Sequence, residues 1–280
     1  MRYKRRTMCR LFAFVSPTPS SVRRELGDTG MERLISLARL HGDGWGWAGV
    51  ERRGEAPGVR KSALSAVSDP DFEDAATTMA RAAMVHLRWA TAGIEIADRN
   101  AHPFLRGAVA FEHNGSLKPI ESARALLSPE SLAEMTGETD SEMYFALIRE
   151  RLALGIPLSA ATADAARMLR EVFPLASLNA IMLDREQMVV VRASARSVLS
   201  DDDLDEIAQH PLLPEEHNED YFALRWTRTD DGALLIGSTG VSGYDWEALP
   251  PESVTTIRLD DLTASTVLLH RAESDVTRAG

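Results

Sequence analysis

The 280-residue chain has little cysteine, few aromatic residues, and no internal repeat or low-complexity tract. Its single cysteine, Cys9, excludes an intramolecular disulfide and a thiolate-rich metal site. With 44% hydrophobic and 26% charged residues, the composition is that of an ordinary globular protein. We expect one domain over residues 9–280, preceded at residues 1–8 by a short leader or by codons upstream of the true start.

Basic residues are in deficit, because 31 lysines and arginines stand against 42 acidic residues and leave a net charge of −11. Such a surface repels phosphate backbones and anionic lipids, so we expect neither nucleic acid nor a membrane as partner. The basic start of the chain is similar to a secretory signal, but the apolar run at residues 8–15 is short and is interrupted by Arg10. We therefore expect a cytoplasmic protein that acts on a small molecule.

Apolar spacing and turn residues predict strands before and after two central helices. Helices are expected at residues 31–40, 71–81, 139–152 and 159–173. Strands are expected around Trp45 and at residues 8–15, 83–88, 108–112, 179–183, 188–193, 221–227, 234–237 and 254–259. The clearest local signal is a capping box, in which Thr139 begins a helix and Glu142 stands three residues later. This order of elements fits an α+β layered domain.

Cys9 has two interpretations. A lone cysteine in a strand is ordinarily a small buried hydrophobe. Cys9 follows Met8, however, and becomes the first residue if translation starts at Met8 or if residues 1–8 are removed. Its α-amine, with a typical pKa of about 7.7–8.0, would then be a general base beside the thiol. Within a chain the same nitrogen is an amide without basicity, so the nucleophilic role requires a free amino end.

Four further segments contain polar residues, and three of them allow both a chemical and a structural interpretation. In His86–Thr91 a guanidinium and a hydroxyl could clamp a carboxylate, or Arg88 could stack on Trp89 at the surface. In His113–Gly115 an amide and a bare N–H could form an oxyanion hole, or Asn-Gly could be a hairpin turn. Asp140 could hold a substrate ammonium or favour a helix start through the dipole. Asn100–Phe104 alone indicates only a turn.

A hydrolytic metal site is an alternative that draws on His41, Asp43, His86, His102 and His113. No HExxH-like helix supports it, because the histidines are scattered over separate segments. We expect no metal and no cofactor.

Taken together, five segments resemble class II glutamine amidotransferase domains in their order and spacing: Cys9–Phe12, His86–Thr91, Asn100–Phe104, His113–Gly115 and Glu138–Asp140. The segments His41–Gly46 and Gly237–Val254 are similar to the stand-alone branch of this family, which includes the ergothioneine-pathway γ-glutamyl amidohydrolase. The resemblance implies the fold of N-terminal-nucleophile hydrolases, a four-layer αββα sandwich of two antiparallel sheets between helix layers.

The resemblance also implies a role for each site residue. Cys9 would be the nucleophile, with Asn114 and Gly115 as oxyanion donors. Arg88 and Thr91 would hold the α-carboxylate, and Asp140 the α-ammonium, of glutamine or a γ-glutamyl amide. The supporting residues would be His86, Trp89 and His102.

The implied reaction passes through a γ-glutamyl thioester on Cys9, which water opens to release glutamate. Two alternatives are a glutaminase subunit that delivers ammonia to a separate synthase and an inactive binding protein, the latter if Cys9 is not N-terminal.

Overall fold

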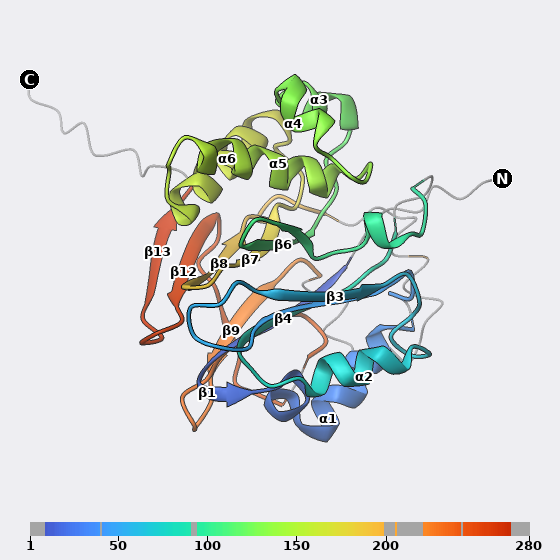
Figure 1. Ribbon diagram of the computed structural model, residues 1–280, viewed down its shortest axis with the longest axis vertical. Coiled ribbons are helices and arrows are strands. Elements are labelled where there is room, and N and C mark those ends of the chain that lie inside the picture. The colour runs from blue at the N-terminus through green and yellow to red at the C-terminus, as the bar shows by residue number, and fades with distance from the viewer. Residues whose placement is uncertain are drawn as a thin grey trace, which may run out of the picture.

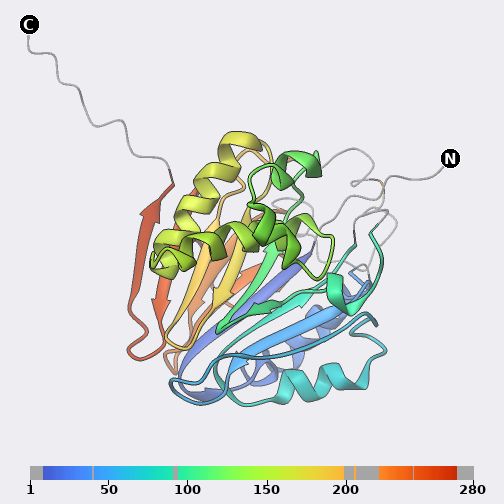
Figure 2. The ribbon, with the colours of Figure 1, turned by 45° about the horizontal axis from the view of Figure 1, so that its top comes forward.

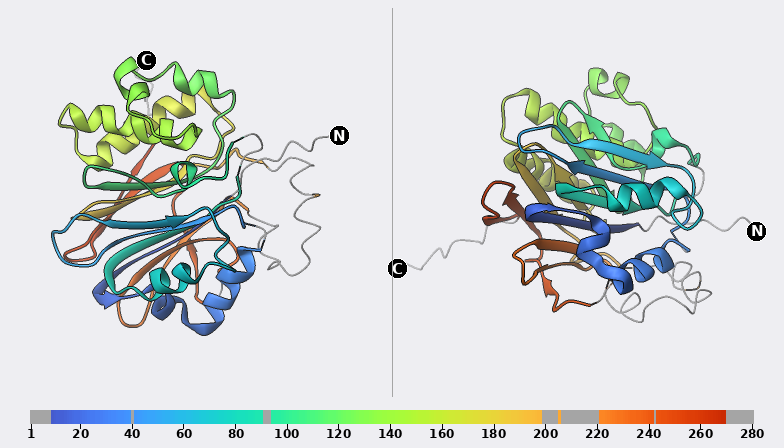
Figure 3. Two further views of the ribbon diagram at one scale, coloured as in Figure 1. Left: turned by 45° about the vertical axis from the view of Figure 1, so that its right-hand side comes forward. Right: turned by 60° about the horizontal axis from the view of Figure 1, so that its bottom comes forward.

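The structure, a computed structural model, describes residues 9–39, 41–90, 94–198, 205, 221–241 and 243–269. Two antiparallel sheets lie face to face, and helices cover the outer face of each, so the predicted four-layer αββα arrangement is confirmed (Figure 1). The layered order is also clear in the left view of Figure 3.

The first sheet has seven strands, with the longest near its centre. In spatial order they are β11 (Glu247–Ala248), β9 (Leu224–Arg228), β10 (Leu234–Ser238), β1 (Arg10–Ser20), β4 (Ala80–Leu87), β2 (Trp45–Val50) and β3 (Gly58–Ser62). Its outer face is covered by α1 (Val22–Leu37) and α2 (Pro70–Thr77).

The second sheet has six strands and carries the other helices. In spatial order the strands are β13 (Ala264–Leu268), β12 (Ser253–Arg258), β8 (Gln187–Arg192), β7 (Asn179–Leu183), β6 (Val109–Asn114) and β5 (Phe104–Arg106). The helices are α3 (Ile120–Arg124), α4 (Pro129–Ala133), α5 (Asp140–Ala153) and α6 (Leu158–Val172). Figure 2 shows the green and yellow helices α5 and α6 crossing the outer face of this sheet.

Strand β1 shows why the central strands are apolar on both faces. Leu11, Ala13 and Val15 pack between the sheets, whereas Phe12 and Phe14 pack against α1 and α2. Side chains alternate between the faces of a strand, so one strand contributes to two separate cores.

Three details differ from the sequence-based predictions. The helix expected at residues 71–81 ends at Thr77, since Thr78 is extended (ψ 127°) and β4 begins at Ala80. The helix expected at 31–40 begins earlier, at Val22, where the Ser21 side chain caps it; Gly27 breaks it with φ 62° and ψ −179°. The hairpin reading of residues 114–115 is wrong, because β6 ends at Asn114 and pairs with the distant strand β7.

Strand register brings the chemical segments together. Leu11 of β1 pairs with His86 of β4, which places Cys9 near the end of β4 where Arg88 follows. Asn114 pairs with Asn179 at the same end of the second sheet. One end of the sandwich therefore collects residues from widely separated parts of the sequence.

Candidate active site

A pocket of about 320 Å³, counted with the open space at its mouth, lies at this end of the sandwich. Five predicted site residues line it: Cys9, Arg88, His102, Gly115 and Asp140. The other lining residues are Ile94, Asn100, His113, Thr139 and Ser141, which the sequence analysis did not assign to the site. Thr91, expected in the carboxylate clamp, lies outside the described residues, as do residues 1–8.

Cys9 is held in place from three sides. Its backbone N–H donates to Asn114 Oδ1 at 2.9 Å, and its carbonyl accepts from Arg10 Nη1 at 3.1 Å. The Arg10 guanidinium lies 3.8 Å above the Tyr221 ring. One residue further on, the Leu11 N–H donates to Ser238 Oγ at 3.1 Å. The backbone at Cys9 is therefore held by the second sheet and by the C-terminal part of the chain.

The Cys9 thiol is protonated at neutral pH. Burial raises its pKa to about 11, although the Trp89 backbone and the charge of Arg88 lower it in part. Only the thiolate is a strong nucleophile. Attack on an amide at neutral pH therefore requires a proton acceptor beside the sulfur.

Asn114 and Gly115 follow one another at the end of β6. The Asn114 side-chain oxygen is bound to Cys9 N–H, which leaves the NH₂ end of the amide as a donor. Gly115 has no space for a side chain, since a Cβ there would lie 1.9 Å from the Ser177 carbonyl oxygen and 2.5 Å from His113 Nε2. The glycine lets the backbone approach Ser177 and His113 this closely, and its N–H follows the Asn114 amide in the chain. An amide NH₂ and a backbone N–H are the kinds of donor that an oxyanion hole needs.

His113 links β6 to the start of α5. Its Nε2 donates to the Ser177 carbonyl at 3.0 Å, because a carbonyl only accepts, and its Nδ1 then accepts from Ser141 Oγ at 2.9 Å. Burial lowers the pKa of His113, which agrees with this neutral tautomer. The sequence signal for this positioning role was its place in the His-Asn-Gly tripeptide.

Arg88 is a buried cation whose hydrogen-bonding capacity is largely unused. Arg88 is 4% exposed, and its Nη1 makes one long contact of 3.4 Å with the Asp43 carbonyl oxygen. The Asp43 carboxylate instead accepts from the Ala90 N–H at 2.8 Å, and no carboxylate of the described residues forms an ion pair with Arg88. A buried guanidinium without an ion-pair partner is suited to bind an anion.

Asp140 is the first residue of α5 and faces the same pocket. Its carboxylate accepts from the Leu117 N–H at 2.6 Å and from the Ser141 N–H at 2.9 Å. Each carboxylate oxygen can accept more than one hydrogen bond, so capacity remains for an ammonium group.

The capping box before α5 is half formed. Thr139 Oγ1 accepts from the Glu142 N–H at 3.1 Å, as predicted. The Glu142 carboxylate accepts from Thr136 N at 2.9 Å and Gly137 N at 2.7 Å, which lie in the preceding loop, rather than from the Thr139 N–H. Glu142 thus fixes the loop that leads into the pocket.

The remaining predicted residues lie behind the pocket lining. The His86 ring stacks on His102 with centroids 4.1 Å apart, and His86 Nε2 donates to the His113 carbonyl at 3.3 Å. Burial lowers the pKa of His86 to about 3, so this ring is neutral. Trp89 packs edge-on against His41.

Asn100, which begins the segment Asn100–Phe104, connects two parts of the pocket wall. Its Oδ1 accepts from the Glu138 N–H at 3.1 Å, and its Nδ2 donates to the Glu95 carbonyl at 3.1 Å. The segment before Asp140 is thereby attached to the chain that follows Arg88. This contact explains why two motifs far apart in sequence serve one site.

Glu112, on β6 two residues before Asn114, is fully buried, and neither of its carboxylate oxygens has a hydrogen-bond partner among the described residues. Burial raises its pKa well above the ordinary value.

Within the described residues, no three His, Cys, Asp or Glu side chains are placed to hold one metal ion. Of the histidines in the metal alternative, His113 uses both ring nitrogens in protein contacts. None of the helices in the described part of the chain has the length and apolar character of a membrane span.

Two solved structures share this fold. A glutamine aminotransferase class-II domain protein from Silicibacter pomeroyi aligns with a TM-score of 0.62 and 19% identity, over 94% of this chain and 100% of that one. Glutamine phosphoribosylpyrophosphate amidotransferase from B. subtilis aligns with a TM-score of 0.65 and 16% identity, over 94% and 50% respectively.

Residues 8–274 match the family model of the class-II glutamine amidotransferases, and the chain belongs to this family. Two curated relatives are glutamine–fructose-6-phosphate aminotransferases. The one from Methanothermobacter thermautotrophicus is 34% identical over 131 residues, 46% of this chain and 21% of the relative. The one from Vibrio parahaemolyticus is 28% identical over 178 residues, 63% of this chain and 28% of the relative. The chain thus spans only a minor part of these relatives.

Proposed function

We propose that this protein cleaves the γ-amide of glutamine or of a γ-glutamyl compound through a thioester on Cys9. The observation that carries the proposal is one pocket that holds the Cys9 thiol, the Arg88 guanidinium and the Asp140 carboxylate. A free amino acid presents an α-carboxylate and an α-ammonium, and Arg88 and Asp140 offer the complementary charges. Membership in the family supports glutamine hydrolysis as the chemistry.

In the proposed reaction the α-carboxylate binds Arg88, with the Thr91 hydroxyl as a further donor, and the α-ammonium binds Asp140. The sulfur of Cys9 attacks the γ-carbonyl carbon while the α-amine of the same residue takes the thiol proton. The Asn114 amide and the Gly115 N–H stabilise the tetrahedral oxyanion. The proton then passes to the leaving nitrogen, ammonia or an amine departs, and water opens the thioester to glutamate.

The proposal makes Cys9 the first residue of the active chain, with residues 1–8 untranslated or removed. The thiol pKa of about 11 supports it, since burial alone leaves the sulfur protonated. The α-amine of Cys9 would supply a base that an internal amide cannot. The intact mass of protein purified from its native host tests this step, because loss of Met1–Met8 is expected and retention of these residues in an active protein would contradict it.

Two fates of the released ammonia or amine are compatible with this chemistry. A stand-alone amidohydrolase with residues 9–280 as one domain, as in the ergothioneine-pathway branch, would release the ammonia or amine. The resemblance of the segments His41–Gly46 and Gly237–Val254 to that branch supports this form. Similarity to part of the larger aminotransferases supports a glutaminase subunit that serves a separate synthase. We propose the stand-alone form as the first candidate.

The test uses a protein whose chain begins at Cys9 and measures the release of glutamate from glutamine and from a panel of γ-glutamyl amides. Cys9→Ala should abolish turnover while leaving the circular dichroism spectrum unchanged. Diazo-oxo-norleucine, an electrophilic glutamine analogue, should add once and at Cys9. Turnover by Cys9→Ala at the wild-type rate would refute the proposal.

A further inference from the structure

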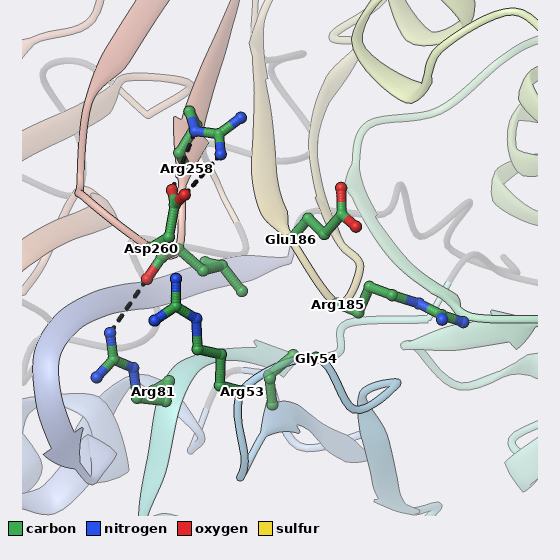
Figure 4. A pocket seen from close by; sticks show the side chains of 9 residues that line it. Arg53, Gly54, Arg81, Arg185, Glu186, Arg258 and Asp260 are labelled. Carbon is green, nitrogen blue, oxygen red and sulfur yellow. Dashed lines mark hydrogen bonds and ion pairs between the residues drawn. The ribbon is translucent and has the colours of Figure 1, made fainter.

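A second pocket lies at the opposite end of the sandwich from Cys9. Its volume is about 750 Å³, counted with the open space at its mouth, and we call it the arginine pocket (Figure 4). It is lined by Val50, Arg53, Gly54, Arg81, Arg185, Glu186, Arg258, Leu259 and Asp260. Arg81 is the second residue of β4, and Arg88 follows its last residue. The two are seven residues apart (88 − 81), which corresponds to about 23 Å of strand at ~3.3 Å per residue. A ligand in this pocket would not contact Cys9.

The charge of the arginine pocket is opposite to that of the whole chain. Four arginines and two carboxylates line it, whereas the chain has 31 basic and 42 acidic residues. The arginines come from separate parts of the fold: Arg53 from the β2–β3 turn, Arg185 from the β7–β8 turn, and the other two from the start of β4 and the end of β12. Clustered cations repel one another unless an anion compensates them.

The arginines differ in how far their charge is compensated. Arg258 is bound by Asp260 through two hydrogen bonds, of 3.0 Å to Oδ1 and 2.6 Å to Oδ2. Arg81 donates only to the carbonyl oxygens of Pro17, at 2.7 Å, and Leu259, at 3.2 Å. These carbonyls orient the Arg81 guanidinium but leave its full charge in place.

Arg53 makes no ion pair with any described residue. Arg53 and Arg81 both line the arginine pocket, and Figure 4 shows the two side chains within it. Two arginines that have no carboxylate partner among the described residues therefore line the same pocket.

We propose that the arginine pocket binds a small molecule that carries a phosphoryl group, with Arg53 and Arg81 as its receptors. A phosphoryl group has close to two negative charges at neutral pH and accepts paired N–H donors, so it matches two guanidiniums that line one pocket better than a single carboxylate does. The volume suits a small ligand, and Val50 and Leu259 supply apolar wall for its uncharged part. Asp260 competes with this ligand for Arg258.

The probe is inorganic pyrophosphate, and its binding is measured by isothermal titration calorimetry at constant ionic strength. The protein carries the Cys9→Ala substitution, so that amide hydrolysis plays no part in the result. Arg53→Gln should weaken binding at least about tenfold, as expected for the loss of a charge-assisted hydrogen bond. The matched control is Arg52→Gln, because Arg52 is the preceding residue, has an 82% exposed side chain, pairs with Glu55 and does not line the pocket. It should leave the affinity within about twofold.

Asp260→Asn is the second variant, and it should strengthen pyrophosphate binding several-fold. It removes a negative charge and the short ion pair with Arg258, and it leaves Arg258 the longer contact of 3.9 Å with Asp261. A purely structural role of Asp260 would instead give weaker binding. Absence of pyrophosphate binding up to about 10 mM, an equal loss in Arg52→Gln and Arg53→Gln, or no gain in Asp260→Asn would overturn the proposal. Acetate at the same ionic strength should compete poorly, and equal competition would assign the pocket to carboxylates.

Discussion

The thiol of Cys9 should be nearly unreactive in a chain that retains residues 1–8. Its pKa is about 11, against an ordinary value of 9.0. At pH 7.5 a thiol with a pKa of 11 is ionised in about one molecule in 3,000, and one with a pKa of 9.0 in about one in 30. Alkylation proceeds through the thiolate, so burial alone should slow it about a hundredfold.

Iodoacetamide labelling followed by intact-mass spectrometry measures this rate without mapping, because Cys9 is the single cysteine. In the folded, full-length chain the rate should rise about tenfold per pH unit from pH 7 to pH 10, since the thiolate fraction does so below the pKa. The same chain unfolded in urea is the control; its rate should reach about half of its maximum near pH 9 and level off above about pH 10. A plateau between pH 8 and pH 9 in the folded chain would refute the assignment of a buried, protonated thiol.

Chain that begins at Cys9 should react faster at pH 7.5 than the full-length chain, because its α-amine can take the thiol proton. The amine titrates at about 7.7–8.0, so the rate should depend on pH over that range. Equal rates and equal pH profiles for the two chains would contradict a base role for the amine.

Three further predictions concern single substitutions. Arg88→Lys should raise the KM for glutamine about tenfold or more with a smaller change in kcat, because an ammonium cannot form the bidentate contact; an unchanged KM would place the carboxylate site elsewhere. Asn114→Asp keeps an acceptor for the Cys9 N–H but loses the NH₂ donor, so kcat should fall about a hundredfold or more, and a wild-type kcat would show that another group binds the oxyanion. The free energy of unfolding of the Glu112→Gln variant, relative to that of the wild type, should increase as the pH rises. The reason is that the raised pKa keeps Glu112 protonated in the folded protein while the unfolded chain loses its proton, which costs up to ~1.4 kcal/mol per pH unit above the unfolded pKa. Urea unfolding at pH 4.5 and pH 7.5 measures this, and a constant difference between the two proteins would contradict it.

Local signals in the sequence predicted most of the elements, because alternation and capping act over a few residues. The strand at 179–183 and the helix start at Thr139 are cases of this kind. Patterns alone could not give the order of strands in the sheets or the contact of Leu11 with Ser238, since these depend on pairing between distant residues. The four-layer arrangement came from the family resemblance rather than from the periodicity.

Within the site, the residue types were visible in the sequence, but their partners were not. The Glu142 carboxylate was expected to bond to the Thr139 N–H, and it binds the preceding loop because two N–H groups there point toward it. The part of Asn100 in joining two pocket walls depends on the fold of both segments. The arginine pocket was missed because single arginines in separate strands and turns form no motif.

Strand β1 lies between β4 and β10, and residues Phe12–Val15 of β1 pair with β10. During synthesis on the ribosome, β10 emerges only after about five sixths of the chain, so one edge of the strand next to Cys9 stays open until then. The catalytic end would therefore be completed late, and fragments that stop before Leu234 should expose this edge and aggregate.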